Sequence, residues 1–255
     1  MLRILSQVGP RKVKARCVPN STEPGRPAEG DPLSLSFAGC AWLFPYHLGA
    51  IEAFRQESAF TNALYLGASS GSLAAVVAAL GIDTQLIMDH TLRFATDARE
   101  RRLGPIGRMS RYVAQGLHEQ LPDDACQRAA GRVKISVTHL PRFQHELVDI
   151  GMCQSREELI SLLLGSCYIP VYYEKPVYWS GRWLIDGGLR NNQPILDRST
   201  IRILPQGPRE GQADIHPARP SSMTDILFPQ PQRLIQLYEA GRRDAEFWLK
   251  TSFHV

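Results

Sequence analysis

Ser69 lies at the centre of a five-residue sequence, GASSG at 67–71, which has the pattern G-x-S-x-G. The apolar residues 63–66 before it predict a short strand, and the apolar residues 72–80 after it predict a buried helix. A serine on a sharp turn between a strand and a helix is typical of a nucleophile elbow, because the strained turn exposes the hydroxyl. Ser69 is therefore the candidate nucleophile.

The residues beside Ser69 support this interpretation. Gly67 and Gly71 carry no side chain, so the strand and the helix can approach closely. The backbone N–H of Ser70 lies at the positive end of the predicted helix and is a candidate donor to an oxyanion. Ser70 and Ser72 are competing nucleophiles, but neither lies midway between the two glycines.

A serine hydroxyl is a weak nucleophile at neutral pH and needs a base. Asp186 is the candidate base, since it ends a short apolar run that predicts a strand and is followed by Gly187 and Gly188. A carboxylate in that position can point into a cleft, with backbone N–H groups nearby to hold it. Asp-Gly is also common in solvated turns, so the residues alone leave both interpretations open.

Histidine is the alternative base. A Ser69–Asp186–His216 triad has the chain order of the α/β-hydrolases, and His254 also follows Asp186. Against the triad, no strong strand precedes His216, and few residues precede Ser69 for the strands that such enzymes build first. His47 lies on an early predicted helix, where we expect it to pack or to line the site. The alternative is that His47 acts as the base.

Strands alternate with helices along the chain. Short apolar or alternating runs predict strands at 33–37, 63–66, 133–137, 183–185 and 201–204. Helical spacing predicts helices at 45–55, 72–80, 83–100, 106–120, 155–164 and 233–249, and the residues 205–222 predict a loop. This alternation predicts a layered α/β fold.

Composition limits the function classes. The 255 residues are enough for one large domain or two small ones, and 44% hydrophobic with 21% charged residues excludes a disordered, collagen-like or coiled-coil chain. The apolar runs are too short to span a membrane. A net charge of +4 does not argue for a nucleic-acid partner, and we expect none. Five cysteines without zinc spacing predict reduced intracellular thiols and no metal site.

The first 31 residues differ from the rest. They are basic and rich in Pro and Gly, and no apolar stretch follows the basic residues, so we expect a flexible leader at 1–31 and not a secretory signal. Its composition is compatible with an organelle transit peptide, and an unstructured tail is the simpler interpretation. The domain itself is expected at 32–255.

These motifs together resemble the patatin-like phospholipases, and within them the adiponutrin and adipose triglyceride lipase branch. The resemblance rests on the ordered segments 35–40, 46–50, 67–71, 163–172, 183–192 and 214–217, and so covers nearly all of the chain after the leader. It implies a three-layer α/β/α sandwich with a central, mostly parallel sheet. It further implies a Ser69–Asp186 dyad without catalytic histidine, metal or cofactor, and makes His216 a structural residue.

One segment departs from the family. The oxyanion loop that the resemblance places at Gly39, Cys40 and Ala41 has G-x-G-x-x-G in the family, whereas Ala41 and Phe44 stand at its second and third glycines here. Glycine lets backbone N–H groups approach an oxyanion in conformations with positive φ. Alanine fits without strain only where φ is negative, and otherwise costs about 1–2 kcal/mol.

Two functions follow as hypotheses. The first is a hydrolase of glycerolipid esters, phospholipid or acylglycerol, in lipid catabolism. The second is a weakly active or non-catalytic lipid-binding member, because of Ala41 and Phe44. Both hypotheses imply an intracellular or cytoplasmic protein that associates with the surface of a membrane or a lipid droplet. Trp42, Leu43 and Phe44 are a candidate apolar lip beside the site, unless they pack under the first helix.

Overall fold

The computed structural model describes residues 32–208 and 213–253, so the expected leader at 1–31 and His254 lie outside the described residues. A central sheet of seven strands runs through the described part of the chain, in the order β5-β6-β3-β2-β1-β7 with β4 beside β3. The strands are β1 (Ser34–Phe37), β2 (Leu64–Ala68), β3 (Val133–Leu140), β4 (Gln144–Asp149), β5 (Val177–Trp179), β6 (Arg182–Ile185) and β7 (Ile201–Ile203).

The sheet is mixed. β7, β1, β2 and β3 are parallel, whereas β4 and β6 run antiparallel to β3, and β5 runs antiparallel to β6. β4 occupies one edge of β3. The other edge is shared, because β2 pairs with Val133–Ser136 and β6 pairs with Thr138–Leu140. β2 and β6 therefore run toward each other along the same edge of β3.

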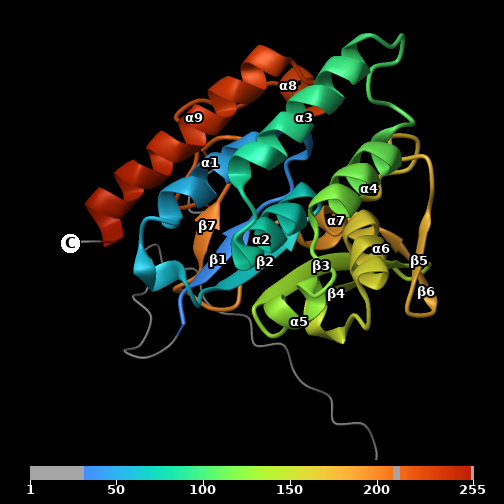
Figure 1. Cartoon of the computed structure of the whole chain (residues 1–255), viewed down its shortest axis with the longest axis horizontal. Coiled ribbons are helices and arrows are strands. Elements are labelled where there is room, and N and C mark those ends of the chain that lie inside the picture. The colour runs from blue at the N-terminus through green and yellow to red at the C-terminus, as the bar shows by residue number, and fades with distance from the viewer. Residues whose placement is uncertain (1–31, 209–212, 254–255) are drawn as a thin grey trace, which may run out of the picture.

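Helices flank the sheet in a three-layer α/β/α arrangement, as expected (Figure 1). They are α1 (Phe44–Phe54), α2 (Ser70–Leu80), α3 (Thr84–Arg99), α4 (Met109–Gln120), α5 (Ala125–Ala129), α6 (Arg156–Cys167), α7 (Gly188–Asn191), α8 (Met223–Leu227) and α9 (Pro231–Trp248). Single turns occur at Ala41–Leu43, Ser58–Phe60, Ile150–Met152 and Leu249–Phe253. α9 runs along α1, and α3 and α4 lie in front of α2.

Local signals in the sequence account for the main helices. α2 is apolar on nearly all sides and is almost completely buried, as its composition predicts. The Ser155 hydroxyl accepts the N–H of Glu158 and so caps the first turn of α6, at the start expected for the helix at 155–164. α4 begins at Met109, three residues later than expected. None of the helices in residues 32–208 and 213–253 is both long enough and apolar enough to cross a bilayer.

Candidate active site

Ser69 lies between the last residue of β2 and the first of α2, on a strained turn. Its φ is 51° and its ψ −131°, a conformation that non-glycine residues rarely adopt. The turn is tight enough that a β-carbon on Gly67 would lie 2.1 Å from the carbonyl oxygen of Gly71. Strain of this kind persists only where the surrounding structure holds it.

Ser166, on α6, holds this turn in place. Its hydroxyl accepts the backbone N–H of Ser69 at 3.0 Å and donates to the carbonyl of Ser136 on β3 at 2.8 Å. The Ser72 hydroxyl donates to the carbonyl of Ser69 at 2.6 Å. Ser72 is thus engaged in the turn itself, while the Ser69 hydroxyl has no such backbone partner among the described residues.

Asp186 follows the end of β6 and is fixed by its own backbone. Its N–H donates to the carbonyl of Tyr168 at 2.8 Å, and its carbonyl accepts the Thr138 hydroxyl at 3.1 Å. In the side chain, Oδ1 accepts the N–H of Gly188 at 2.7 Å, while Oδ2 is buried and accepts no hydrogen bond of normal geometry from the described residues. One carboxylate oxygen is therefore anchored and the other is free.

The shared edge of β3 brings Ser69 and Asp186 together. Ala68, the last residue of β2, pairs with Ser136, and Ile185, the last residue of β6, pairs with Thr138. Two residues of a strand span about 7 Å, so the two strand ends meet over Val137. The residues that follow these ends, 117 positions apart in the sequence, face each other at this point.

The surroundings of Asp186 change the pKa of its carboxyl group. Burial raises the pKa of Asp186 from 3.8 to about 6, and the neighbouring Ser69 hydroxyl and the Gly188 N–H offset part of this rise. The carboxylate is 9% exposed. A carboxylate whose pKa lies close to neutrality is a stronger base than an exposed aspartate and is still ionised at pH 7.

Gly39 and Asn192 lie against this pair. The N–H of Gly39 donates to the Asn192 carbonyl at 3.1 Å, and the Asn192 side-chain amide donates to the Gly39 carbonyl at 3.1 Å. A β-carbon on Gly39 would lie 2.9 Å from the β-carbon of Ser69. These bonds join the loop after β1 to the helix that follows Asp186.

The backbone N–H groups of the loop at 39–41 differ in whether they are already hydrogen-bonded within the protein. Those of Gly39 and Cys40 are already bonded within the protein, the latter to the Ser70 hydroxyl at 3.0 Å. Within the described residues Ala41 donates no hydrogen bond from its N–H, and Ser70 begins α2, so its N–H has no acceptor in that helix. Ala41 has φ 48°, so alanine occupies a left-handed position that suits glycine, whereas Phe44 is helical with φ −46°.

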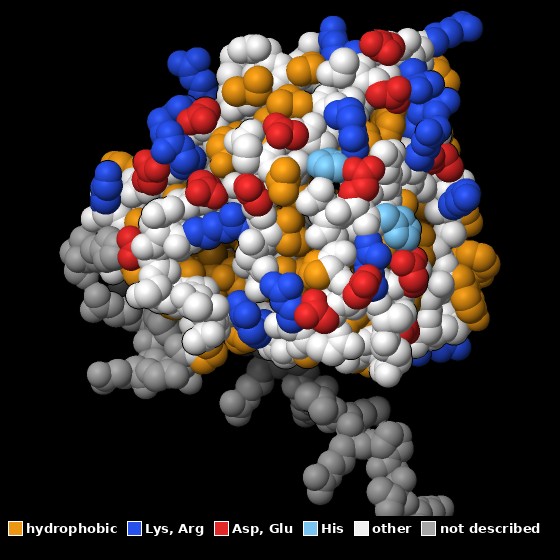
Figure 2. All heavy atoms as spheres, viewed as in Figure 1, with side chains coloured by type: hydrophobic (Ala, Val, Ile, Leu, Met, Phe, Trp, Pro, Cys, Tyr) orange, Lys and Arg blue, Asp and Glu red, His pale blue; other side chains and the backbone are white. Residues whose placement is uncertain are grey.

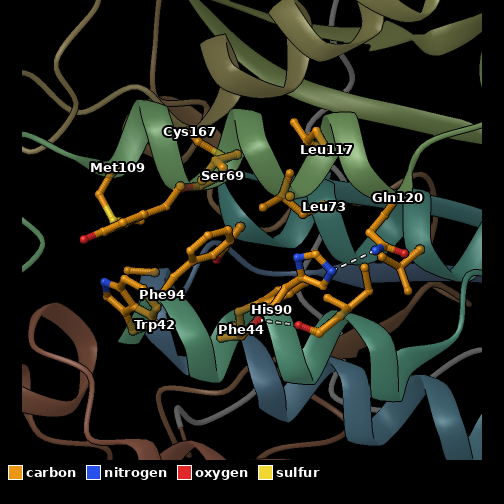
Figure 3. A pocket seen from close by; sticks show the side chains of 18 of the residues that line it. Trp42, Phe44, Ser69, Leu73, His90, Phe94, Met109, Leu117, Gln120 and Cys167 are labelled. Atoms are coloured by element: carbon orange, nitrogen blue, oxygen red, sulfur yellow. Dashed lines mark hydrogen bonds between the residues drawn. The ribbon is translucent and has the colours of Figure 1, made fainter. Parts of the chain in front are cut away.

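An apolar cavity of about 130 Å³ opens from Ser69 between α2, α3 and α4 (Figure 3). Leu73, Phe94, Met109 and Leu117 form part of its wall. In Figure 3, Ser69 and Cys167 lie on the upper side of the cavity, between Met109 and Gln120, and His90 lies below them. Gln120 and His90 are joined by a hydrogen bond of 2.9 Å. The cavity wall is mainly apolar, with these few polar side chains set into it.

Three cavity residues had no signal in the sequence. Cys167 lies beside Ser69, but burial raises its pKa far above the usual range, so it remains a thiol and a poor nucleophile. Tyr173 lies within reach of Cys167 and Asp186 and is likewise held neutral, since burial raises its pKa. His90 is the only histidine of the described residues that lines the cavity, across from Ser69.

The other histidines lie elsewhere. The Nε2 atom of His47 is 2.8 Å from the carbonyl oxygen of Ala38, and burial lowers the pKa of this histidine to about 4, so it is neutral and holds the end of β1. The Nδ1 atom of His216 lies 3.1 Å from the carbonyl oxygen of Pro217. Neither lines the cavity. In residues 32–208 and 213–253 no three His, Cys, Asp or Glu side chains gather as a metal site requires.

The expected apolar lip is wrong. Trp42, Leu43 and Phe44 are 5%, 0% and 9% exposed. The indole N–H of Trp42 donates to the Tyr172 hydroxyl at 2.8 Å, and this bond turns the ring inward. Trp42 and Phe44 form part of the inner wall of the cavity instead.

Known proteins share this sequence pattern. Residues 35–198 match the sequence profile of the patatin-like phospholipases. The mouse 1-acylglycerol-3-phosphate O-acyltransferase Pnpla3 is 32% identical over 192 residues, covering 72% of this chain and 45% of the relative. Mouse patatin-like phospholipase domain-containing protein 2 is 30% identical over 244 residues, covering 85% and 50%. This chain thus spans about half the length of those curated relatives.

In two further comparisons, the matched region covers a larger share of the other protein. Human patatin-like phospholipase domain-containing protein 4 is 31% identical over 250 residues, covering 87% of this chain and 98% of the relative. VipD from Legionella pneumophila superposes with a TM-score of 0.52 at 13% identity, covering 86% and 66%, and shows the likeness of fold alone. The chain belongs to the patatin-like phospholipase family.

Proposed function

We propose that this chain hydrolyses acyl esters of glycerolipids, with Ser69 as nucleophile and Asp186 as base. The observation that carries the proposal is the meeting of a serine on a strained turn with a buried, half-anchored carboxylate, beside an apolar cavity. The names of the relatives, phospholipases and an acyltransferase of lipid substrates, agree with acyl chemistry on lipids.

The proposed reaction begins at the free Oδ2 of Asp186. It accepts the Ser69 proton as the serine oxygen attacks the ester carbonyl, and the protonated carboxyl then gives that proton to the departing alcohol. The acyl group remains on Ser69. Asp186 next takes a proton from water, which attacks the acyl-enzyme and releases the fatty acid, and the proton returns to Ser69. No histidine is needed, because one carboxyl performs every proton transfer.

The oxyanion that forms in each attack needs donors. The N–H groups of Ala41 and Ser70 are proposed for this role, since both residues line the cavity and their N–H groups remain available. Removing one such donor commonly costs about 10²–10³ in rate. Gly39 and Cys40 support the loop in this scheme by the hydrogen bonds described above.

The cavity is proposed to hold one acyl chain. Its wall is apolar along α2, α3 and α4, and transferring a chain from water into such a wall gains about 0.8 kcal/mol per methylene. Because such substrates are insoluble, the proposal includes peripheral contact with a membrane or a lipid-droplet surface.

A weakly active or purely lipid-binding protein is the second candidate, favoured by Ala41 at φ 48° in the loop that would receive the oxyanion. A fluorophosphonate probe and a short-chain nitrophenyl ester separate the two. Hydrolase function predicts that Ser69→Ala abolishes labelling and turnover, and that Asp186→Asn reduces turnover at least 10³-fold. Ser58→Ala, an exposed serine remote from the cavity, is the matched control. Turnover unchanged in Ser69→Ala would refute the hydrolase, and lipid binding without turnover would favour the second candidate.

A further inference from the structure

Three surface segments meet where the cavity reaches the outside of the protein. They are the α3–α4 loop at 100–108, the loop after α6 at 168–174, and α8 with Phe228. The N–H of Gly107 donates to the Tyr172 carbonyl at 3.0 Å, and the Tyr172 hydroxyl donates to the Leu227 carbonyl at 2.7 Å. A β-carbon on Gly104 would lie 3.2 Å from the ring of Phe228.

Each of these segments exposes large apolar side chains. Leu103 is 64% exposed, Ile169 39%, Val171 80% and Phe228 42%. We call these four residues the mouth surface. Ile169 also lines the cavity that begins at Ser69, so the mouth surface surrounds an opening of the cavity. Exposed apolar side chains that gather on neighbouring segments commonly mark an interaction site.

Val171 is held outward against its own backbone preference. Its φ is 73°, which is a genuine outlier for a β-branched residue. The turn is fixed from both sides, because Tyr172 and Tyr173 are buried and the N–H of Tyr173 donates to the Ile169 carbonyl at 2.9 Å. The strained turn thus keeps the most exposed apolar residue of the mouth surface pointing away from the core.

Positive charge lies along one side of the mouth surface, on the α3–α4 loop, while the other two segments carry Glu174 and Asp225, the latter paired with Arg233. Residues 99–111 contain five arginines and one acidic residue, Glu100. Arg101 is paired with Asp97, whereas Arg102 and Arg108 form no salt bridge within the described residues. Figure 2 shows Lys and Arg side chains gathered with apolar ones at the upper right edge of the molecule, over the α3–α4 loop of Figure 1. Apolar groups beside unpaired arginines fit an anionic lipid surface.

We propose that the mouth surface docks on anionic phospholipid, with Leu103, Val171 and Phe228 entering the acyl boundary and Arg102 and Arg108 contacting headgroups. This inference rests on the proposed function, and it adds the docking face and the charge of the lipid. The opening at Ile169 then faces the lipid layer, so an acyl chain passes from the bilayer into the cavity without crossing water.

The test is co-sedimentation of the full chain with phosphatidylcholine vesicles, with and without phosphatidylserine. Wild type is expected to bind the anionic vesicles preferentially. The double variant Arg102→Gln/Arg108→Gln is expected to lower the partition coefficient about thirty-fold, because each basic residue near an anionic surface contributes about five-fold. Val171→Gly is expected to lower it about ten-fold while leaving thermal stability unchanged or higher, since glycine tolerates the positive φ. Leu103→Ser gives an independent apolar test.

Matched controls come from the far end of α9. Phe247 is 69% exposed and Arg243 is exposed, so Phe247→Ser and Arg243→Gln remove the same groups at a distance from the mouth surface. Residues 1–31 are present in every variant, so any contribution they make to vesicle binding is the same in all of them. Equal losses in the controls, or wild-type binding that is indifferent to phosphatidylserine, would overturn the inference.

Activity on a short soluble ester separates this inference from the proposed function. Mouth-surface variants are expected to retain that activity, while Ser69→Ala is expected to lose it and still bind vesicles. Wild type that cleaves the short ester but binds vesicles without preference for phosphatidylserine would leave the hydrolase standing and refute this docking face. Wild type that binds anionic vesicles through the mouth surface, with turnover unchanged in Ser69→Ala, would leave the docking face standing and refute the hydrolase.

Discussion

Ala41 offers the most direct test of the loop beside the site. Its φ of 48° lies in the left-handed region, where a β-carbon costs about 1–2 kcal/mol. Replacing it by glycine removes that cost but adds the larger entropy that glycine loses on folding, about 0.5–1 kcal/mol. Ala41→Gly is therefore expected to stabilise the protein by about 0.5–1 kcal/mol, a rise of roughly 1–4 °C in Tm for a chain of this size.

The assay is thermal unfolding beside urea denaturation, with Ala114→Gly as the matched control. Ala114 lies within α4, where the same substitution is expected to destabilise by about 1 kcal/mol. The two substitutions should thus change the free energy of unfolding in opposite directions, and the two variants should differ by about 2 kcal/mol. If Ala41→Gly destabilises as much as Ala114→Gly, the left-handed conformation of Ala41 is wrong, and the argument about this loop fails with it.

Activity in the same variant bears on the oxyanion role. Glycine leaves the N–H of residue 41 in place and removes a methyl group beside the substrate carbonyl, so turnover of a short ester is expected to stay equal or rise. Phe44→Gly is the contrasting variant, because Phe44 is helical and packs on the cavity wall. It is expected to lose stability, by about 3 kcal/mol or more, without a gain in turnover. A large fall in turnover for Ala41→Gly would contradict the scheme.

Four further predictions concern the dyad and the cavity. Because the folded pKa of Asp186 is raised to about 6, kcat/KM should rise with pH around 6, and an inflection near 4 would contradict the burial argument. The same raised pKa makes the ionised carboxylate unfavourable in the folded protein, so the stability that this group contributes is fully present below pH 3.8 and lost as pH rises through about 6. Asp186→Asn should therefore raise the free energy of unfolding at pH 8 by up to about 3 kcal/mol, measured by urea denaturation. Ser166→Ala should lower kcat more than it raises KM and cost about 1–3 kcal/mol, because the Ser69 N–H and the Ser136 carbonyl lose their partner; Ser199→Ala, at an exposed turn, is its control. Leu117→Trp should block the cavity and abolish turnover of long-chain esters while short esters are still cleaved, and equal losses for both would argue against an acyl site there.

Sequence reasoning predicted what local patterns encode. The strand and helix around Ser69 follow from apolar runs and two glycines, and α6 begins directly after Ser155 because an N-cap serine is a local signal. β4 was missed since Gln144–Asp149 is polar, exposed in its first residues and held by pairing with β3, which no local pattern shows. The layered α/β class needed only the alternation of elements.

The site depends more on distant contacts. Asp186 had a weak local signal and was singled out chiefly by the family resemblance, because its approach to Ser69 comes from β2 and β6 sharing one edge of β3. Ser166 gave no signal, since its two hydrogen bonds join three elements. The lip at Trp42 was wrong because a bond to Tyr172, 130 residues away, turns the indole inward.

The common edge that β2 and β6 occupy on β3 also limits how the protein can move. The spacing of Ser69 and Asp186 is set by a single strand buried at the centre of the sheet, so neither residue can shift without breaking ladder hydrogen bonds. Such amides are among the last to exchange with solvent. The cavity walls on α3 and α4 take no part in these ladder bonds, so adjustment to substrates of different shape falls on the helical side rather than on the reacting groups.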